Sequence, residues 1–444
     1  GTDASNYTVA AAGSTTADIT PRVLAVGYTG VNKVYDGGLV ASVTTSDDRV
    51  VGDSLSIVRS AAFGDKNVGG GKAVTVSDVS LTGTDADNYT VASTGSTTAN
   101  ITQRALTVAY VGVNRVYDGG IVATVTTSDD RVAGDDLSIV RSAVFADKNV
   151  GTGKQVSVSG VSLSGTDADN YSVSSTATTT ANITAKLLTV TYGGVNKVYD
   201  GVRTATVTTS DDRVNGDVLS VVRTAAFSDK NAATGKTVSV SGVSLTGADA
   251  DNYSVASTGS TTANITQRVL TVAYNGVDRV YDGGTIATVT TSDDRVAGDV
   301  LSIVRSAAFG DKNVGAGKAV TVSGVSLSGT DAGNYSVAGG GATTAEITPR
   351  TLIINYGGVN KVYDGGITAS VTTSDDRVLN DVLTIARTAA FSDKNAALGK
   401  TVTVTGVSLS GTDAQNYVVA TSGTTTADIT PRALTPTFGG ISKI

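Results

Sequence analysis

The chain has 444 residues, contains no Cys, His, Met or Trp, and carries a formal net charge of -7. Without Cys and His it has no disulfides, no thiolate metal ligands and no imidazole base, which excludes the usual hydrolase triads and zinc sites. The acidic balance argues against nucleic acid as a partner, and no apolar stretch is long enough to insert in a membrane.

The sequence repeats itself every 82 residues: the trio Tyr35-Asp36-Gly37 returns at Tyr117, Tyr199, Tyr281 and Tyr363. A unit of this length is too long for one rung of a solenoid and has the size of a small domain. We predict the tail of a preceding repeat (1–21), five repeats (22–103, 104–185, 186–267, 268–349 and 350–431) and the start of a further, diverged module (432–444).

Within repeat 1, apolar and polar residues alternate with a period of two, which is typical of half-buried strands. This pattern predicts strands within 23–28, 54–63, 72–83 and 98–102. In the third of these, the apolar phase shifts by one residue at Ser77-Asp78, which predicts a β-bulge. Turn clusters separate the strands and no segment has a helical stripe. The predicted fold class is therefore all-β, with each repeat a small antiparallel, immunoglobulin-like β-sandwich.

The connection between repeats is very short. Only Gln103 and Arg104 separate the last predicted strand of repeat 1 from the first of repeat 2. Two residues cannot act as a flexible tether, so neighbouring modules must abut. The tandem array is therefore expected to form a stiff rod, with neighbouring repeats as partners of one another.

The recurring trio has two interpretations. It can be a tyrosine and a carboxylate that grip a sugar, or a turn in which Tyr is an anchor and Asp-Gly favours positive φ. We favour the structural interpretation and predict no catalytic residue. The structural motif comprises Tyr35, Asp36, Gly37, Tyr117, Asp118, Gly119, Tyr199, Asp200, Gly201, Tyr281, Asp282, Gly283, Tyr363, Asp364 and Gly365.

A cluster of acids in each repeat raises the question of a metal. Asp47, Asp48 and Asp53 could supply oxygen ligands to calcium, but their spacing differs from that of an EF-hand loop and no bidentate Glu closes it. We favour solvated turn acids, and therefore no cofactor. Calcium at the joints between modules stays open as the alternative.

Two basic positions also recur. Arg59 lies in phase with apolar residues of its strand, so either the strand is at an edge or Arg59 pairs with a turn carboxylate such as Asp48, and we favour the ion pair. Lys66 and Asn67 suggest a Lys–Asn isopeptide crosslink. Adjacent residues in a turn cannot bond to each other, which leaves Asn88 as a speculative partner.

Taken together, the motifs resemble the YDG repeats of bacterial surface adhesins. The resemblance covers all five units and rests on "VYDG", "GD.L", "AAF.DKN.G.GK.V.V.GVSL.GTDA.NY" and "TTA.IT". The family is related to the glycine-rich modules called MBG domains, which occur in large secreted proteins similar to filamentous haemagglutinin. The resemblance implies a secreted or cell-surface stalk, and no catalytic residues.

The sequence thus predicts a non-enzymatic structural stalk or spacer that extends a binding region from a bacterial cell surface. One alternative is a self-assembling extracellular filament or biofilm-matrix component, in which identical chains meet laterally or end to end through open strand edges. A weaker alternative is a multivalent glycan-binding array that uses exposed Tyr and Asp. The low aromatic content, 5%, counts against the last.

Overall fold

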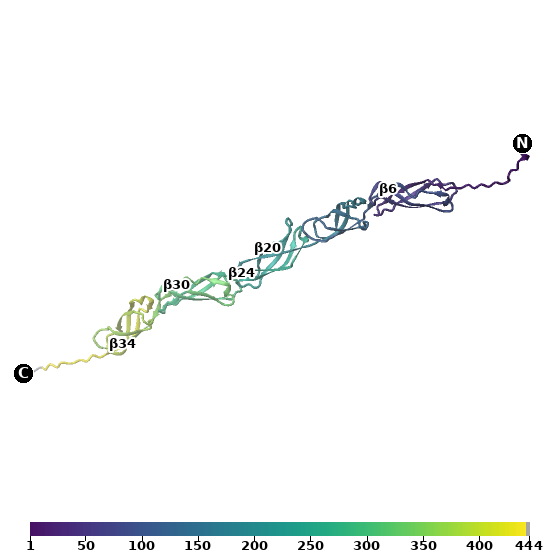
Figure 1. The fold of residues 1–444 in the computed structure, drawn as a ribbon. Helices are drawn as coiled ribbons and strands as arrows, with labels where there is room; N and C mark the ends of the chain where they lie inside the picture. Colours follow the sequence, from purple (N-terminus) through teal and green to yellow (C-terminus); the bar gives the residue numbers. More distant parts are fainter. Residues whose placement is uncertain (441–444) are drawn as a thin grey trace, which may run out of the picture. The chain divides into compact units, whose positions relative to one another are not determined.

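The computed structural model describes residues 1–440 (Figure 1). These residues form forty β-strands and six 3-10 turns of three residues each, and include no α-helix. The prediction of an all-β array is therefore confirmed. Within the described residues, no helix has the length and apolar character needed to cross a membrane.

The chain divides into two compact units, and the division runs through repeat 3. The first unit holds repeats 1 and 2 with residues 186–190, 211–222 and 244–256 of repeat 3. The second holds the remainder of repeat 3 with repeats 4 and 5.

The elements recur in the same order in each repeat, from β6 in repeat 1 to β34 in repeat 5 (Figure 1). Before repeat 1 lies η1 (Ala4–Asn6). Repeat 1 contains β1 (Arg22–Val23), β2 (Val26–Val31), β3 (Lys33–Val34), β4 (Ser42–Asp47), β5 (Ser56–Phe63), β6 (Gly69–Thr82), η2 (Ala86–Asn88), β7 (Tyr89–Thr90) and β8 (Gly95–Thr102). Repeat 2 contains β9 (Arg104–Ala105), β10 (Val108–Gly112), β11 (Arg115–Val116), β12 (Val125–Asp129), β13 (Ser138–Phe145), β14 (Gly151–Ser164), η3 (Ala168–Asn170), β15 (Tyr171–Ser172) and β16 (Ala177–Thr184).

The later repeats follow the same plan. Repeat 3 contains β17 (Lys186–Leu188), β18 (Val190–Val195), β19 (Lys197–Val198), β20 (Thr206–Asp211), β21 (Ser220–Phe227), β22 (Ala233–Thr246), η4 (Ala250–Asn252), β23 (Tyr253–Val255) and β24 (Thr258–Thr266). Repeat 4 contains β25 (Arg268–Leu270), β26 (Val272–Val277), β27 (Arg279–Val280), β28 (Thr288–Asp293), β29 (Ser302–Phe309), β30 (Gly315–Ser328), η5 (Ala332–Asn334), β31 (Tyr335–Val337) and β32 (Gly340–Thr348). Repeat 5 contains β33 (Arg350–Leu352), β34 (Ile354–Val359), β35 (Lys361–Val362), β36 (Ser370–Asp375), β37 (Thr384–Phe391), β38 (Ala397–Ser410), η6 (Ala414–Asn416), β39 (Tyr417–Val419) and β40 (Gly423–Thr430).

In repeat 1 the strands build a four-stranded sheet, in the order β3-β8-β6-β5, and two two-stranded sheets, β2-β4 and β1-β7. The pairs β5–β6, β6–β8 and β2–β4 are antiparallel, as predicted. The short pairs β3–β8 and β1–β7 are parallel, which corrects the purely antiparallel prediction. Each of these pairs joins only two residues of each strand, too few for periodicity in the sequence to reveal their direction.

The core of repeat 1 lies between its sheets. Val74 and Val76 of β6 are fully buried, Ile101 of β8 is 1% exposed and Phe63 of β5 is 3% exposed. They pack in one cluster with Val43 of β4. Alternation along each strand therefore places one face of each sheet in a shared apolar layer, as in a small sandwich.

The predicted bulge is confirmed. The pairing of β5 with β6 shifts between Val58 and Ser60, opposite residues 77–80. Asp78 has a φ of 54°, and the glycines at this position in repeats 2–5 have φ of about 62°. Because this left-handed conformation costs glycine little, glycine is the commoner residue there.

The structure answers the question raised by Arg59. Strand β5 lies at the edge of its sheet, as one interpretation predicted. The Arg59 guanidinium donates to the carbonyl oxygens of Ile57 and Val43, and so links strand β5 to strand β4. The ion pair with Asp48, which we favoured, is wrong, because that carboxylate accepts from Arg22 at 2.9 Å.

Gly30 lets β2 approach β8 closely, and we expect its replacement to destabilise repeat 1. A Cβ at Gly30 would lie 2.3 Å from the Thr98 carbonyl oxygen and 2.8 Å from the Ala99 Cβ. Because strand backbone cannot move aside cheaply, Gly30→Ala should lower the free energy of unfolding of repeat 1 by about 1–3 kcal/mol. Hydrogen exchange of the β8 amides measures this.

The matched control is Gly70→Ala in the same repeat. The only neighbour of its added Cβ is the Asn100 side-chain oxygen at 3.7 Å, an ordinary contact distance. Equal exchange rates in the two variants would show that the close approach of β2 to β8 does not contribute to the stability of repeat 1.

Candidate functional site: the joints between repeats

The tyrosine of the recurring trio crosses from one repeat into the next. Tyr35 follows β3, and its backbone N–H donates to the Thr102 carbonyl at 2.9 Å, which anchors it beside the end of β8. Its side chain is 1% exposed. The phenol donates to a carboxylate of repeat 2, Asp135, at 2.9 Å. The trio therefore lies at a joint between modules.

Asp135 is the centre of this joint. It accepts hydrogen bonds from the hydroxyls of Tyr35 and Tyr171, the latter at 2.6 Å, and from the Lys66 ammonium at 2.8 Å. Lys66 also pairs with Asp167 at 2.9 Å. Two side chains of repeat 1 thus converge on two carboxylates of repeat 2, and the buried carboxylate has three donors, as a buried charge requires.

The same set is built at the other three joints. Its members there are Tyr117, Lys148, Asp217, Asp249 and Tyr253 at the second joint; Tyr199, Lys230, Asp299, Asp331 and Tyr335 at the third; and Tyr281, Lys312, Asp381, Asp413 and Tyr417 at the fourth. Each joint lies wholly inside one of the two compact units.

The other two residues of the trio have separate tasks. Asp36 accepts from the Gly38 N–H at 2.9 Å and from Lys33 at 2.7 Å, which fixes the turn. Gly37 has a φ of 77°, and a Cβ there would lie 2.7 Å from the Cγ1 of Val132 in repeat 2. Glycine therefore satisfies both the left-handed turn and the close approach of the next module.

Apolar packing continues across the joint. The ring of Tyr35 meets that of Tyr171 edge-on, with centroids 5.4 Å apart and planes at 73°. Leu106 and Leu137 of repeat 2 belong to the same buried cluster as the core of repeat 1. Edge-to-face rings and a shared apolar cluster are features of an interior rather than of a wet surface contact.

Amide groups close the side of the joint. The backbone N–H of Val68 donates to Asn170 Oδ1 at 2.8 Å, and Asn170 Nδ2 donates to Asn67 Oδ1 at 3.3 Å. Asn170 is 3% exposed. The connecting residue Gln103 also donates to the Asp169 carbonyl, at 3.0 Å. Recurrence of Asn67 in the sequence is thereby explained by contact with the following repeat.

We expect Asn170→Ala to loosen the first joint. The substitution leaves the part-buried Val68 N–H without its acceptor, and an unmet donor of this kind costs about 1–3 kcal/mol. Hydrogen exchange at Val68 should speed up, with the core of repeat 2 unchanged. Asn88→Ala is the control, because Asn88 is the same position in repeat 1 and its side chain is exposed. Equal acceleration at Val68 in the control would contradict this account.

The charges of the joint stabilise one another. Burial raises the pKa of Asp135, but hydrogen bonds from Lys66, Tyr171 and Tyr35 outweigh this and hold the pKa below its usual value. The hydrogen bonds that the Lys66 ammonium donates to Asp135 and Asp167 raise the pKa of Lys66. Burial, and then the bond to Asp135, raises the pKa of Tyr171 to about 12. A lysine held protonated is a poor nucleophile, which opposes the isopeptide hypothesis.

The three calcium candidates have separate partners. Asp47 pairs with Arg49 at 2.6 Å, Asp48 accepts from Arg22, and Asp53 accepts from the hydroxyl of Tyr89. Within residues 1–440, no group of three or more acidic side chains is arranged to hold a metal ion. Asp53 occupies in repeat 1 the position that Asp135 occupies in repeat 2. At the joints, the carboxylate at this position therefore binds tyrosine hydroxyls and a lysine ammonium rather than a metal ion.

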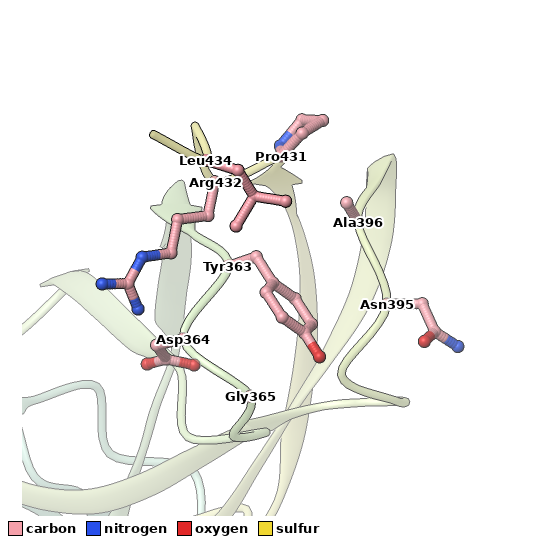
Figure 2. A pocket seen from close by; sticks show the side chains of 8 residues that line it. All are labelled: Tyr363, Asp364, Gly365, Asn395, Ala396, Pro431, Arg432 and Leu434. Atoms are coloured by element: carbon pink, nitrogen blue, oxygen red, sulfur yellow. The ribbon is translucent and has the colours of Figure 1, made fainter. Parts of the chain in front are cut away.

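At repeat 5 the tyrosine has no following module among the described residues. Tyr363 lines an open pocket of about 540 Å³ with Asp364, Gly365, Asn395, Ala396, Pro431, Arg432 and Leu434. Figure 2 shows the ring between Asp364 on one side and Asn395 and Ala396 on the other. The surface that is filled at the four joints is therefore open here.

Comparison with known proteins identifies a family. The YDG domain matches residues 20–99, 102–181, 184–263, 266–345 and 348–427. No curated protein matches the chain. One similar solved structure is described as "Structure of surface layer protein SbsC, domains 4-9"; the match has 11% identity and a TM-score of 0.15, and covers 88% of this chain and 82% of that chain. At this TM-score the two chains do not superimpose over their length.

Proposed function

Because the chain belongs to the YDG domain family, we propose that its repeats are a structural spacer of a secreted bacterial surface adhesin, which extends a binding region away from the cell. The observation that carries this proposal is the fourfold recurrence of one buried joint. A joint in which two modules share a core cluster and a three-donor carboxylate resists bending more than a flexible linker does.

The placement of the trio also weighs against the glycan-binding alternative. The tyrosines at the four joints are buried, with exposed fractions of only 1–2%. A sugar needs an exposed aromatic face on which to stack, and these rings instead pack against the tyrosine of the next repeat. A repeated structural contact explains the repetition without any ligand.

Small-angle X-ray scattering of the purified chain tests the spacer role. A stiff spacer should have a single maximum dimension that does not change with ionic strength, and a variant with Ala at Asp135, Asp217, Asp299 and Asp381 should scatter as a more flexible chain. Scattering by the unaltered chain that already fits freely jointed modules would overturn the proposal. Labelling of intact bacteria with an antibody to the repeats tests the cell-surface location.

A further inference from the structure

Tyrosine is the side chain of this sequence that most readily gives up an electron. The chain has sixteen tyrosines, no Cys or Met, which are the side chains that oxidants usually attack first, and no Trp or His. An oxidant that removes an electron from this protein should therefore take it from a phenol. The positions of the tyrosines then decide which phenols can react with one another.

Eight of the sixteen tyrosines form pairs across the joints, with one ring from each of the two repeats. In the first joint the ring centroids of Tyr35 and Tyr171 are 5.4 Å apart. The same spacing recurs at the other three joints, in the pairs Tyr117–Tyr253, Tyr199–Tyr335 and Tyr281–Tyr417. All eight side chains are buried, with exposed fractions of 1–7%. Each joint therefore brings together two phenols from different modules, out of contact with water.

The two hydroxyls of a pair share one carboxylate. In the first joint both donate to Oδ2 of Asp135, Tyr35 at 2.9 Å and Tyr171 at 2.6 Å. A phenoxyl radical couples through the ring carbons next to its oxygen, so a shared acceptor brings the reactive edges of the two rings to one place. The carboxylate is also within reach of both phenol protons, and an oxidised phenol is a strong enough acid to give its proton to a carboxylate.

Lys66 provides a path by which the proton can leave. Its ammonium donates to Asp135 at 2.8 Å and pairs with Asp167 at 2.9 Å. The Asp135 side chain is 2% exposed, whereas that of Asp167 is 14% exposed. If Lys66 gives one proton to Asp167 and takes up the proton on Asp135, the central carboxylate is restored for the second phenol. The joint can therefore release one proton from each tyrosine without opening.

We propose that the tyrosine pair at each joint is an oxidative crosslinking site, where a one-electron oxidant such as the ferryl haem of a peroxidase forms a dityrosine bond between neighbouring repeats. Each phenol loses one electron to the oxidant and one proton to the central carboxylate. The two radicals form one carbon–carbon bond between their Cε atoms, and the hydrogen on each of these carbons moves to the phenol oxygen. Two electrons and two protons leave in total, and with a peroxidase they convert hydrogen peroxide to two molecules of water.

The crosslink would give the joint a covalent bond in addition to its packing and hydrogen bonds. In a chain without Cys no disulfide can have this role. In the first joint the bond would close a loop from Tyr35 to Tyr171, and so restrain the two modules against separation. The spacer role does not require the crosslink, so a failure of one proposal leaves the other standing.

Photo-oxidation of the purified, dilute chain tests the proposal. Ruthenium tris-bipyridyl with persulfate takes electrons from phenols on illumination without needing a binding site on the protein. The oxidised chain is then unfolded and cut with trypsin. Tyr35 and Tyr171 lie in the tryptic peptides 34–49 and 155–186, neither of which contains another tyrosine. Mass spectrometry should find these two peptides joined with the loss of two hydrogen atoms, and the corresponding peptides joined at the other three joints.

Tyr35→Phe is the matched variant, because it keeps the ring and removes the phenol. It should abolish the joined peptides of the first joint and leave those of the other three joints unchanged, which also shows that the chain is folded. Tyr28→Phe is the control, since Tyr28 lies in β2 and forms no ring pair across the joint. All four products should persist in this control.

Two results would overturn the proposal. One is oxidation that consumes tyrosine in the folded chain without joining the peptides of any joint. The other is a yield of the joint products that is no higher in the folded chain than in a chain oxidised in urea, because the geometry of the joint would then not direct the coupling.

Discussion

Replacing Asp135 with Ala should open the joint between repeats 1 and 2 and leave both modules folded. The carboxylate is 2% exposed and accepts from two phenols and an ammonium of the joint. Removing one partner of a buried pair typically costs about 3–5 kcal/mol, because the remaining groups stay buried without partners. Hydrogen exchange should therefore accelerate at Val68 and at residues 103–106, and a protease should cut near Gln103.

The control for this substitution is Asp53→Ala. Asp53 occupies the same position in repeat 1 and accepts from Tyr89, but no lysine or tyrosine of a preceding repeat donates to it among residues 1–440. The loss of stability should be smaller than that caused by Asp135→Ala, and faster hydrogen exchange should be confined to the start of repeat 1. If the two substitutions produced equal effects, the carboxylate would matter to its own module rather than to the joint.

Much of the fold could be predicted from the sequence because its signals are local. Alternation with a period of two, the phase shift at Ser77-Asp78 and the turn residues each depend on neighbours in the chain. The bulge is present in the structure, whereas the ion pair favoured for Arg59 is not, because its strand lies at a sheet edge and the guanidinium donates to backbone carbonyls. The two short parallel pairs could not be predicted, because a two-residue ladder leaves no periodicity.

The joint was only partly predictable, for a physical reason. The sequence singled out Tyr35, Lys66 and Asp53 separately, as an anchor, a crosslink candidate and a metal ligand. In the structure their counterparts meet across modules: Tyr35 contacts a residue 100 positions later, and Lys66 one 69 positions later. When all repeats have nearly the same sequence, a residue that contacts its own module and a residue that contacts the next module recur with the same period. Recurrence therefore shows that a residue matters without showing which copy it touches.

The second large effect concerns pH, because all four joints carry the same titrating groups. The pKa of each central carboxyl, at Asp135, Asp217, Asp299 and Asp381, is lowered; burial opposes this, and hydrogen bonds from the lysine and the two tyrosines outweigh the burial. A lowered folded-state pKa stabilises the joint above the unfolded value of 3.8, and this contribution is lost as pH falls through the folded value. Acid should therefore open the joints.

The loss of joint stability at high pH follows from the tyrosine that each joint receives from its second repeat. Burial, and then the carboxylate beside them, raises the pKa of Tyr171, Tyr253, Tyr335 and Tyr417 to about 12, from 10.0. A raised folded-state pKa means that the protonated phenol is the form the joint stabilises. That contribution is complete below pH 10 and is lost as pH rises through about 12.

The joints should thus be intact from about pH 4 to 10 and open together on either side of this window, as the unfolded-state values of 3.8 and 10.0 require. Scattering across a pH series, with tyrosinate absorbance recorded on the same samples, measures the opening and the ionisation together. Because the free-energy contributions of well-separated sites add, the stabilisation lost over the four joints should be about four times the stabilisation lost at one joint. The variant with Ala at all four carboxylates should scatter as a flexible chain across the whole pH series, since its joints are already open at neutral pH. Opening of the unaltered chain near neutral pH would contradict the assignment, because none of the joint's carboxyls or phenols changes its charge there.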